Sequence, residues 1–207
     1  MPVNNTNRAN TKRRLAILVS GRGSNMAAIA EACQSGELNA TVSIVISNNP
    51  DVPALAAAQS FGIETAVVNH RQYTQREDFD QALHETLLPH DPDWIALAGF
   101  MRILGTDFVR KWQGRIINIH PSLLPRYPGL NTHSRAIANG DKEAGATVHI
   151  VTETLDDGPI VAQEGVPIND HDTAETLSNR VLAIEHTLYI KALKQCITVD
   201  RPVARLQ

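Results

Sequence analysis

The sequence has few cysteines, no strong excess of either charge and no long hydrophobic run. Its 19 Lys and Arg residues stand against 22 Asp and Glu residues, and a formal net charge of −3 provides no basic field for a polyanion. The longest apolar run, 94–101, is far shorter than the ~20 residues that span a bilayer. We therefore expect neither a nucleic-acid partner nor a membrane partner.

The two cysteines, Cys33 and Cys196, lie in helix-like contexts and lack the CxxC spacing of metal sites. So small a number suits a reducing compartment. The sequence also lacks a charged and then apolar signal segment. These observations favour a soluble, cytoplasmic protein.

The chain is long enough, at 207 residues, to enclose a full hydrophobic core, and one domain over 13–207 is the natural expectation. Residues 1–12 are rich in Asn, Thr and Arg and have no apolar periodicity, which predicts a disordered leader. A basic start without acidic residues is also compatible with a transit peptide, although no amphipathic pattern supports that alternative.

Apolar runs alternate with helical patterns along the first 120 residues. Strands are predicted at 15–19, 42–46, 64–68, 94–100 and 115–120, and helices at 26–33, 53–61, 74–88 and 107–111. Such alternation is typical of a parallel sheet with right-handed crossovers. We therefore expect a single-domain, Rossmann-like α/β fold with a mostly parallel sheet and helices on both faces.

The C-terminal part of the chain breaks this alternation. A short helix is predicted at 133–139, strands at 146–152 and 160–168, and a long final helix at 173–196. Residues 153–159 favour a turn between the two strands, so the C-terminal part of the sheet is expected to be mixed. The tail, 197–206, is compatible with a further edge strand.

A glycine-rich turn follows the first predicted strand. Its sequence, SGRGSN at 20–25, leads into a helix whose first N–H groups and positive end favour an anion such as phosphate. The dinucleotide fingerprint requires a small residue where Met26 stands and an acidic residue near 47–49, and the Gly-Lys-Ser/Thr of a Walker loop is missing. The pattern therefore predicts a small phosphorylated ligand and excludes NAD and ATP. A plain tight turn with Ser24 or Asn25 as helix N-cap is the alternative.

The stretch INIHPSLLPRYPG at 117–129 joins the end of a strand to a stiff loop. Alternation along the strand turns the side chains of Asn118 and His120 to one face, and the prolines that follow prevent the strand from continuing. The C-terminal tip of such a strand is where open α/β sheets place ligands. Taken alone, either residue is better explained as a loop histidine or a turn asparagine.

An asparagine amide and a histidine in one place permit acyl-type transfer. The amide donates a hydrogen bond to a developing oxyanion, the imidazole gives or takes a proton, and a carboxylate orients that imidazole. Asp156 and Asp157 lie in the predicted turn, and one of them faces His120 if the turn folds over the sheet. The sequence has no GxSxG nucleophile, which favours direct attack by a substrate amine.

A metal site is the alternative use of these side chains. His120, His133 and Asp156 form the candidate ligand set, but no HxH or HExxH spacing supports it. We therefore expect no metal.

Four motifs of this chain occur together in a known family. They are SGRGSN at 20–25, AGFMRIL at 98–104, NIHPSLLP at 118–125 and LDDGP at 155–159. Together they closely resemble the phosphoribosylglycinamide formyltransferase family, folate-dependent enzymes of purine synthesis, over residues 14–189. The HPSLLP block is shared with a wider formyltransferase and deformylase group, whereas RYPGL at 126–130 resembles the glycinamide ribonucleotide branch.

The resemblance implies that the domain 13–207 transfers the formyl group of 10-formyltetrahydrofolate to the amine of glycinamide ribonucleotide. Asn118 is then expected to stabilise the tetrahedral oxyanion, His120 to carry the proton and Asp156 to support the charged histidine. Ribonucleotide contacts are implied for Gly23, Ser24, Asn25, Leu182, Ala183, Ile184 and Glu185. Folate contacts are implied for Arg76, Met101, Arg102, Ile103, Leu104, Asn118, Thr152, Glu153, Thr154, Leu155 and Asp156.

Two positions depart from the family pattern. Arg22 replaces a small or amide residue in the phosphate turn, where it either adds a phosphate contact or points to solvent. Asp157 replaces the usual glycine beside the catalytic aspartate, which leaves the identity of the His120 partner open. The sequence also leaves open whether the protein is a monomer or a homodimer.

Two other activities remain as alternatives. The first is a hydrolase that releases formate from the same folate, and the phosphate turn speaks against it. The second is a non-catalytic folate or nucleotide-binding module, which gives no reason for Asn118, His120 and Asp156 to coexist.

Overall fold

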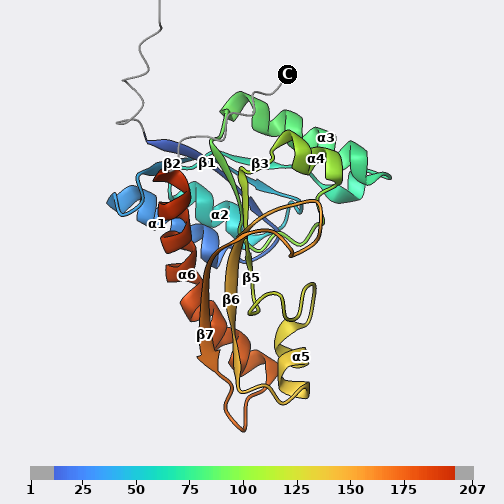
Figure 1. Cartoon of the computed structure of the whole chain (residues 1–207). Coiled ribbons are helices and arrows are strands. Elements are labelled where there is room, and N and C mark those ends of the chain that lie inside the picture. Colours follow the sequence, from blue (N-terminus) through green and yellow to red (C-terminus); the bar gives the residue numbers. More distant parts are fainter. Residues whose placement is uncertain (1–11, 199–207) are drawn as a thin grey trace, which may run out of the picture.

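A seven-stranded sheet organises residues 12–198, which are the residues that the computed structural model describes (Figure 1). The strands lie in the order β3-β2-β1-β4-β5-β6-β7. Their bounds are β1 Arg13–Val19, β2 Ala40–Ser47, β3 Thr65–Val67, β4 Trp94–Leu97, β5 Ile116–His120, β6 Glu143–Ile150 and β7 Ile160–Pro167. Strands β1 to β5 pair in parallel, whereas β6 and β7 run antiparallel. The mixed C-terminal part of the sheet is therefore confirmed.

The direction of strand addition reverses at β1. Strands β2 and β3 lie on one side of it, and β4 and β5 lie on the other. In open α/β sheets, ligands bind beyond the carboxyl ends of the strands at such a switch point. Because β1, β4 and β5 are parallel, the loops that follow them open at the same edge of the sheet.

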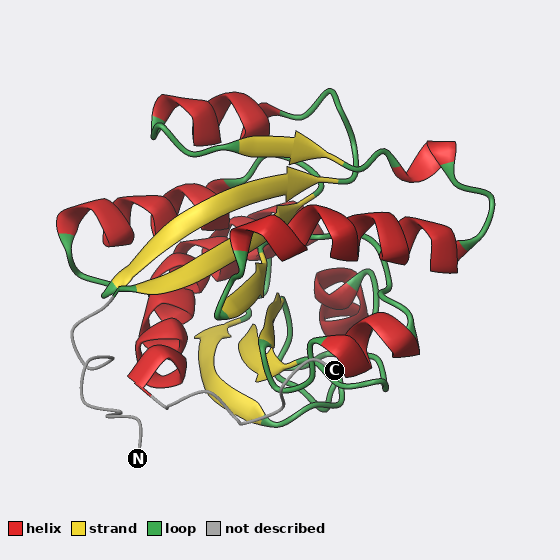
Figure 2. Ribbon diagram, turned by 90° about the horizontal axis from the view of Figure 1, so that it is seen from above, coloured by secondary structure: helices red, strands yellow, loops and turns green. Residues whose placement is uncertain are grey.

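Helices cover both faces of the sheet, as seen from above in Figure 2. Their bounds are α1 Ser24–Ser35, α2 Pro53–Ser60, α3 Arg76–Leu87, α4 Thr106–Lys111, α5 Thr132–Ala138 and α6 Ala174–Thr198, with short 3₁₀ turns η1 His70–Gln72 and η2 Leu88–His90. Alternate residues of β1 enter two separate cores. Leu15, Ile17 and Val19 pack with residues of α1, α2 and α6, whereas Ala16 and Leu18 pack with residues of α3 and α4. This division fits a parallel strand buried on both sides.

Helix α6 is fixed to the middle of the sheet by Tyr189. The side chain is fully buried, and its hydroxyl lies 3.1 Å from the carbonyl oxygen of Leu97 in β4 and 2.9 Å from that of Ile117 in β5. Burial raises the pKa of this phenol well above its ordinary value, so the group stays a neutral donor. The final helix thereby braces the two strands that lead into the candidate site.

Most predicted elements agree with the structure, and the differences have local causes. The strand expected at 94–100 ends at Leu97, since Gly99 adopts a left-handed φ of 72° that stops an extended strand. Ile197 and Thr198, expected in an edge strand, belong to α6. The rest of that tail, 199–206, and the predicted leader up to residue 11 lie outside the described residues.

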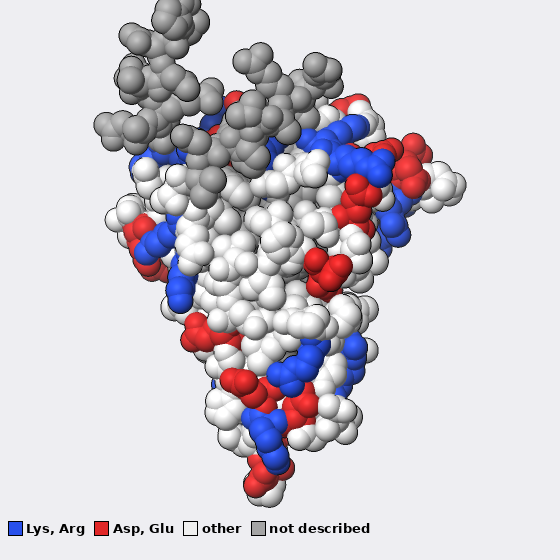
Figure 3. Space-filling view, viewed as in Figure 1, with Lys and Arg blue, Asp and Glu red and all other residues white. Residues whose placement is uncertain are grey.

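The surface seen in Figure 3 carries both charges. Lys and Arg side chains alternate with Asp and Glu side chains around the edge of this face, and most of its middle carries neither. Among residues 12–198, no helix has the length and apolar character needed to cross a bilayer.

Candidate active site

The tip of β5 presents an amide and an imidazole side by side. Ile117 and Ile119 enter the core under α6, so Asn118 and His120 face the opposite side of the sheet, as the alternation predicted. His120 is buried, with an exposed fraction of 5%. In the antiparallel pairing with β6, Asn118 lies opposite His149, and His120 lies opposite Thr147.

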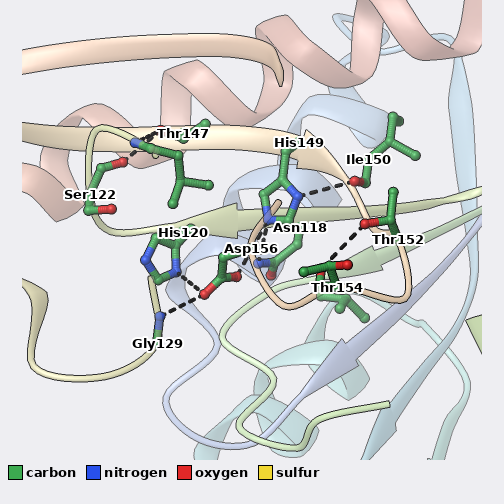
Figure 4. A network of polar contacts seen from close by, with 12 residues as sticks. Asn118, His120, Ser122, Gly129, Thr147, His149, Ile150, Thr152, Thr154 and Asp156 are labelled. Atoms are coloured by element: carbon green, nitrogen blue, oxygen red, sulfur yellow. Dashed lines mark hydrogen bonds and ion pairs between the residues drawn. The ribbon is translucent and has the colours of Figure 1, made fainter. Parts of the chain in front are cut away.

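The loop between β6 and β7 brings a carboxylate to this pair (Figure 4). One carboxylate oxygen of Asp156, Oδ2, lies 3.4 Å from Nδ1 of His120 and accepts a 2.8 Å hydrogen bond from the backbone N–H of Gly129. The other oxygen, Oδ1, lies 3.7 Å from Nε2 of His149. The structure therefore brings Asp156 to His120, whereas Asp157 is exposed to solvent.

Asp156 is held in its ionised form. Burial opposes ionisation, but the His149 side chain, the N–H of Gly129 and the charge of His120 outweigh it, and the pKa of Asp156 falls below its ordinary value. The backbone of Asp156 is left-handed, with φ of 53°. Gly158 permits this turn, because a side chain there would overlap the carbonyl oxygen of Ile150.

The second ring nitrogen of His120 is engaged by the following loop. Nε2 lies 2.9 Å from the carbonyl oxygen of Tyr127. A carbonyl oxygen can only accept, so Nε2 carries a proton and Nδ1 is the nitrogen that faces Asp156. At 3.4 Å, the Nδ1–Oδ2 contact is longer than the 2.7–2.9 Å of a charge-assisted hydrogen bond.

His149 is a site residue that the sequence analysis missed. Its Nε2 lies 3.2 Å from the amide nitrogen Nδ2 of Asn118, and its Nδ1 lies 3.1 Å from the carbonyl oxygen of Ile150. Nε2 thus faces both the amide nitrogen of Asn118 and the carboxylate of Asp156, and the imidazole lies against these two side chains. The amide nitrogen has two N–H donors, so at least one remains for a substrate oxygen. Polar residues alternate along 147–149, but only the strand register shows that they meet β5.

Thr147 holds the loop that follows His120. Its fully buried hydroxyl accepts hydrogen bonds from the backbone N–H of Leu124 at 3.0 Å and from the side chain of Gln163 at 2.7 Å, and it donates to the carbonyl oxygen of Ser122 at 2.6 Å. These contacts fix the start of the loop, which contains the cis bond Leu124-Pro125.

Thr147→Val is expected to destabilise the fold by about 1–3 kcal/mol, because it keeps the shape of the side chain and leaves Leu124 N–H and Ser122 C=O without their partner. Denaturant unfolding of the two proteins measures the difference. Thr147→Ser retains the hydroxyl and should lose much less stability; equal losses in the two variants would assign the effect to packing.

A second cluster forms at the start of α1. Gly23 precedes the helix with φ of 79°, and a Cβ atom there would lie 2.6 Å from the Cβ of Ala54. Asn25 donates a 2.7 Å hydrogen bond from Nδ2 to Oε2 of the buried Glu185 in α6. Burial raises the pKa of Glu185, and the hydrogen bond from Asn25 opposes that rise. The turn 23–25 and the segment 182–185, predicted to bind one ligand, are thus in contact.

Several residues predicted to contact folate lie in the loops that follow β4 and β6. Apolar side chains that are more than half exposed, Met101, Ile103 and Leu155, come from the loops after β4 and β6. Glu153 ties the second loop to α4 through two hydrogen bonds from Arg110, at 2.8 and 3.1 Å. Exposed apolar side chains on anchored loops are suited to a flat organic ligand.

The remaining predicted residues lie around these clusters. Arg76 begins α3 and lines a cavity of about 490 Å³ between α3 and α4, next to Gly105. Arg102 and Leu104 lie in the loop after β4, and Thr152 donates to the carbonyl oxygen of Thr154 within the β6–β7 loop. In the described part of the chain, no hydrogen bond joins the Asn25–Glu185 cluster to the cluster of Asn118, His120 and Asp156. Arg22 is exposed.

A doubly wound sheet with an amide, an imidazole and a carboxylate at its switch-point edge is typical of α/β enzymes that act on small molecules. Residues 13–193 match the family model described as formyl transferase, and the chain therefore belongs to the formyl transferase family.

Relatives narrow this assignment to one branch. Phosphoribosylglycinamide formyltransferase of Escherichia coli strain K12 is 43% identical over 175 residues, which cover 84% of this chain and 82% of that protein. The crystal structure of phosphoribosylglycinamide formyltransferase from Brucella melitensis has a TM-score of 0.86 at 45% identity and covers 92% of this chain and 98% of its own. The chain thus groups with the phosphoribosylglycinamide formyltransferases.

Some relatives are much longer than this chain. The trifunctional purine biosynthetic protein adenosine-3 of Homo sapiens is 45% identical over 183 residues, which are 88% of this chain and 18% of that protein. The chain spans between 14% and 18% of the length of four such trifunctional proteins.

Proposed function

We propose that this protein transfers the formyl group of 10-formyltetrahydrofolate to the amine of 5'-phosphoribosylglycinamide, giving formylglycinamide ribonucleotide and tetrahydrofolate in purine biosynthesis. The observation that carries the proposal is the contact of Asp156 with His120 beside the amide of Asn118, in a chain of this family. Both substrates are small molecules. The folate is a co-substrate that donates the formyl group, and the chemistry requires neither a metal nor NAD.

The reaction forms a C–N bond between the substrate amine and the formyl carbon and breaks the bond between that carbon and N10 of the folate. Negative charge develops on the formyl oxygen, where the remaining N–H of Asn118 stabilises it. The amine loses a proton and N10 gains one, and His120 moves that proton through Nδ1. The ionised Asp156 stabilises the positive charge of the ring while it holds two protons.

The two substrates divide the site between them in this proposal. The ribonucleotide phosphate binds the free N–H groups of Ser24 and Asn25 at the positive end of α1, and Glu185 contacts the glycinamide end. The folate ring packs on the loops 101–104 and 152–156, and its tail approaches Arg76. Residues 182–184 complete the ribonucleotide side.

A formyl-transfer assay tests the proposal. Purified protein is mixed with 10-formyltetrahydrofolate, and tetrahydrofolate release is followed with and without the ribonucleotide while the formyl acceptor is identified by mass spectrometry. Release that requires the ribonucleotide and formylates its amine is expected. Release of free formate without the ribonucleotide would instead make the protein a hydrolase, and absence of both reactions would leave a binding role.

Ser24→Pro is expected to raise the KM for the ribonucleotide roughly 10- to 100-fold, the cost of one hydrogen bond to a charged group. Proline fits the first position of a helix, so the variant removes one N–H while α1 is kept. Steady-state kinetics with each substrate varied in turn gives both KM values. Ser24→Ala keeps the N–H and is the control; an unchanged ribonucleotide KM in Ser24→Pro would refute the phosphate assignment.

A further inference from the structure

The hydroxyl of Ser20 joins two loops that belong to different substrates in the proposed function. Ser20 follows β1, and its Oγ accepts a 2.7 Å hydrogen bond from the backbone N–H of Met101, the first residue of the loop 101–104. The same hydroxyl donates to Oδ1 of Asn48. The side chain of Asn48 is buried, with an exposed fraction of 4%. The Ser20 hydroxyl therefore donates a hydrogen bond to the buried Asn48 and accepts one from the loop 101–104.

The sheet topology creates this meeting point. Strand β1 lies between β2 and β4, so the residues after these three strands meet at the switch-point edge. Asn48 follows β2, and its N–H lies 3.4 Å from the carbonyl oxygen of Val19. Its side-chain amide is also 3.0 Å from Nδ1 of His70. Asn48 is thereby held from both sides, and it holds Ser20.

The chain continues from Ser20 directly into the turn 23–25. Gly21 accepts a 3.2 Å hydrogen bond from the N–H of Ala54 in α2, which limits the freedom of the intervening residues. The turn 23–25 and the N–H of Met101 are thus linked through residues 20–22 and one hydrogen bond. The far end of the loop is held differently, because Gly105 donates a 2.7 Å hydrogen bond to the buried Asp80 of α3.

We propose that Ser20 is a positioning residue that couples the two substrate sites, so that each substrate binds more tightly when the other is present. The inference rests on the proposed function, which assigns 23–25 to the ribonucleotide and 101–104 to the folate. A substrate that orders one loop also orders the other through the Ser20 hydroxyl. Such coupling is reciprocal, and the factor must be the same for both ligands.

The experiment measures dissociation constants by calorimetry on the full chain. Tetrahydrofolate, which lacks the formyl group, is titrated with and without saturating glycinamide ribonucleotide, so no reaction occurs. For the unaltered protein we expect the ribonucleotide to tighten tetrahydrofolate binding by about fivefold or more. In Ser20→Ala this factor should fall to about one, and tetrahydrofolate alone should bind roughly 2- to 10-fold more weakly through loss of one neutral hydrogen bond.

Two further variants separate coupling from general damage. Asp80→Ala frees the far end of the same loop, so it should weaken tetrahydrofolate binding but retain the coupling factor. Ser20→Thr keeps a hydroxyl and should restore coupling; if Ser20→Ala does not fold, Asn48→Leu removes the acceptor of the same hydroxyl and takes its place.

The outcomes distinguish this inference from the proposed function. Coupling that survives in Ser20→Ala, or that is absent from the unaltered protein, would overturn the inference while turnover continued to support the function. Equal loss of coupling in Asp80→Ala and Ser20→Ala would also overturn it, because loop order alone would then explain the result. An unaltered protein that bound neither substrate would refute the proposed function itself.

Discussion

Replacing His120 by alanine is expected to lower the rate of formyl transfer roughly 10²- to 10⁴-fold, the usual contribution of a positioned acid or base. The imidazole faces the carboxylate of Asp156 through Nδ1, the nitrogen through which the proposed mechanism moves the substrate proton. It does not take part in the Asn25–Glu185 cluster, so the KM for the ribonucleotide should change little. Single-turnover kinetics measures the chemical step separately from product release.

A matched variant tests whether this loss is specific. His171→Ala removes an exposed histidine outside the helices and strands, and it should leave the rate unchanged. A His120→Ala protein that retained most of its single-turnover rate would remove the proposed proton transfer through this ring.

Replacing Asp156 by asparagine is the second change with a large expected effect, again a loss of roughly 10²- to 10⁴-fold in rate. Asparagine keeps the size of the side chain and removes its negative charge, which in the proposed mechanism stabilises the doubly protonated ring. Ribonucleotide affinity should stay close to that of the unaltered protein. The single-turnover rate and both KM values give this comparison.

Asp157→Asn is the control that the chain itself provides. The neighbouring carboxylate is exposed, and the variant carries the same change in charge one residue further along the loop. Its rate should remain near that of the unaltered protein. Similar losses in the two variants would show that total loop charge, and not the contact with His120, is what the reaction needs.

Asp156→Asn also has a pH-dependent effect on stability. The folded-state pKa of Asp156 lies below its unfolded value, so its ionised form stabilises the fold above the unfolded pKa of about 3.9. That contribution is lost as the pH falls through the folded-state pKa. Denaturant unfolding at several pH values should therefore show a difference between the two proteins that is full at neutral pH and shrinks in acid. A difference that did not depend on pH would point to packing.

The agreement between sequence and structure is best where a pattern is local. Buried runs such as 15–19 predict strands, and their alternation with helical patterns predicts a parallel sheet. Within a strand, successive side chains point to opposite faces of the sheet, so the sequence also predicts which residues share a face. The same alternation placed Asn118 and His120 on one face of β5. Prolines after His120 ended the strand for a reason that is also local, the missing N–H.

Contacts between distant segments required the tertiary structure. The residue pattern left Asp156 and Asp157 open as partners of His120, and the family resemblance favoured Asp156. The structure places Oδ2 of Asp156 3.4 Å from Nδ1 of His120. His149 reached Asn118 through the register of β6 on β5, and a shift of one residue would have turned it to the other face. The alternation of polar and apolar residues within one strand does not predict which residue of the neighbouring strand lies opposite.

The sequence by itself determined a doubly wound α/β chain, the glycine-rich turn before its first helix and the amide–imidazole pair, because each depends on neighbours within a few residues. Only the tertiary structure decided the contact between Asp156 and His120, the position of His149 beside Asn118 and the hydrogen bond between Ser20 and Met101. Those features depend on strand order, register and loop path. They arise from packing and hydrogen bonding between segments that lie tens of residues apart.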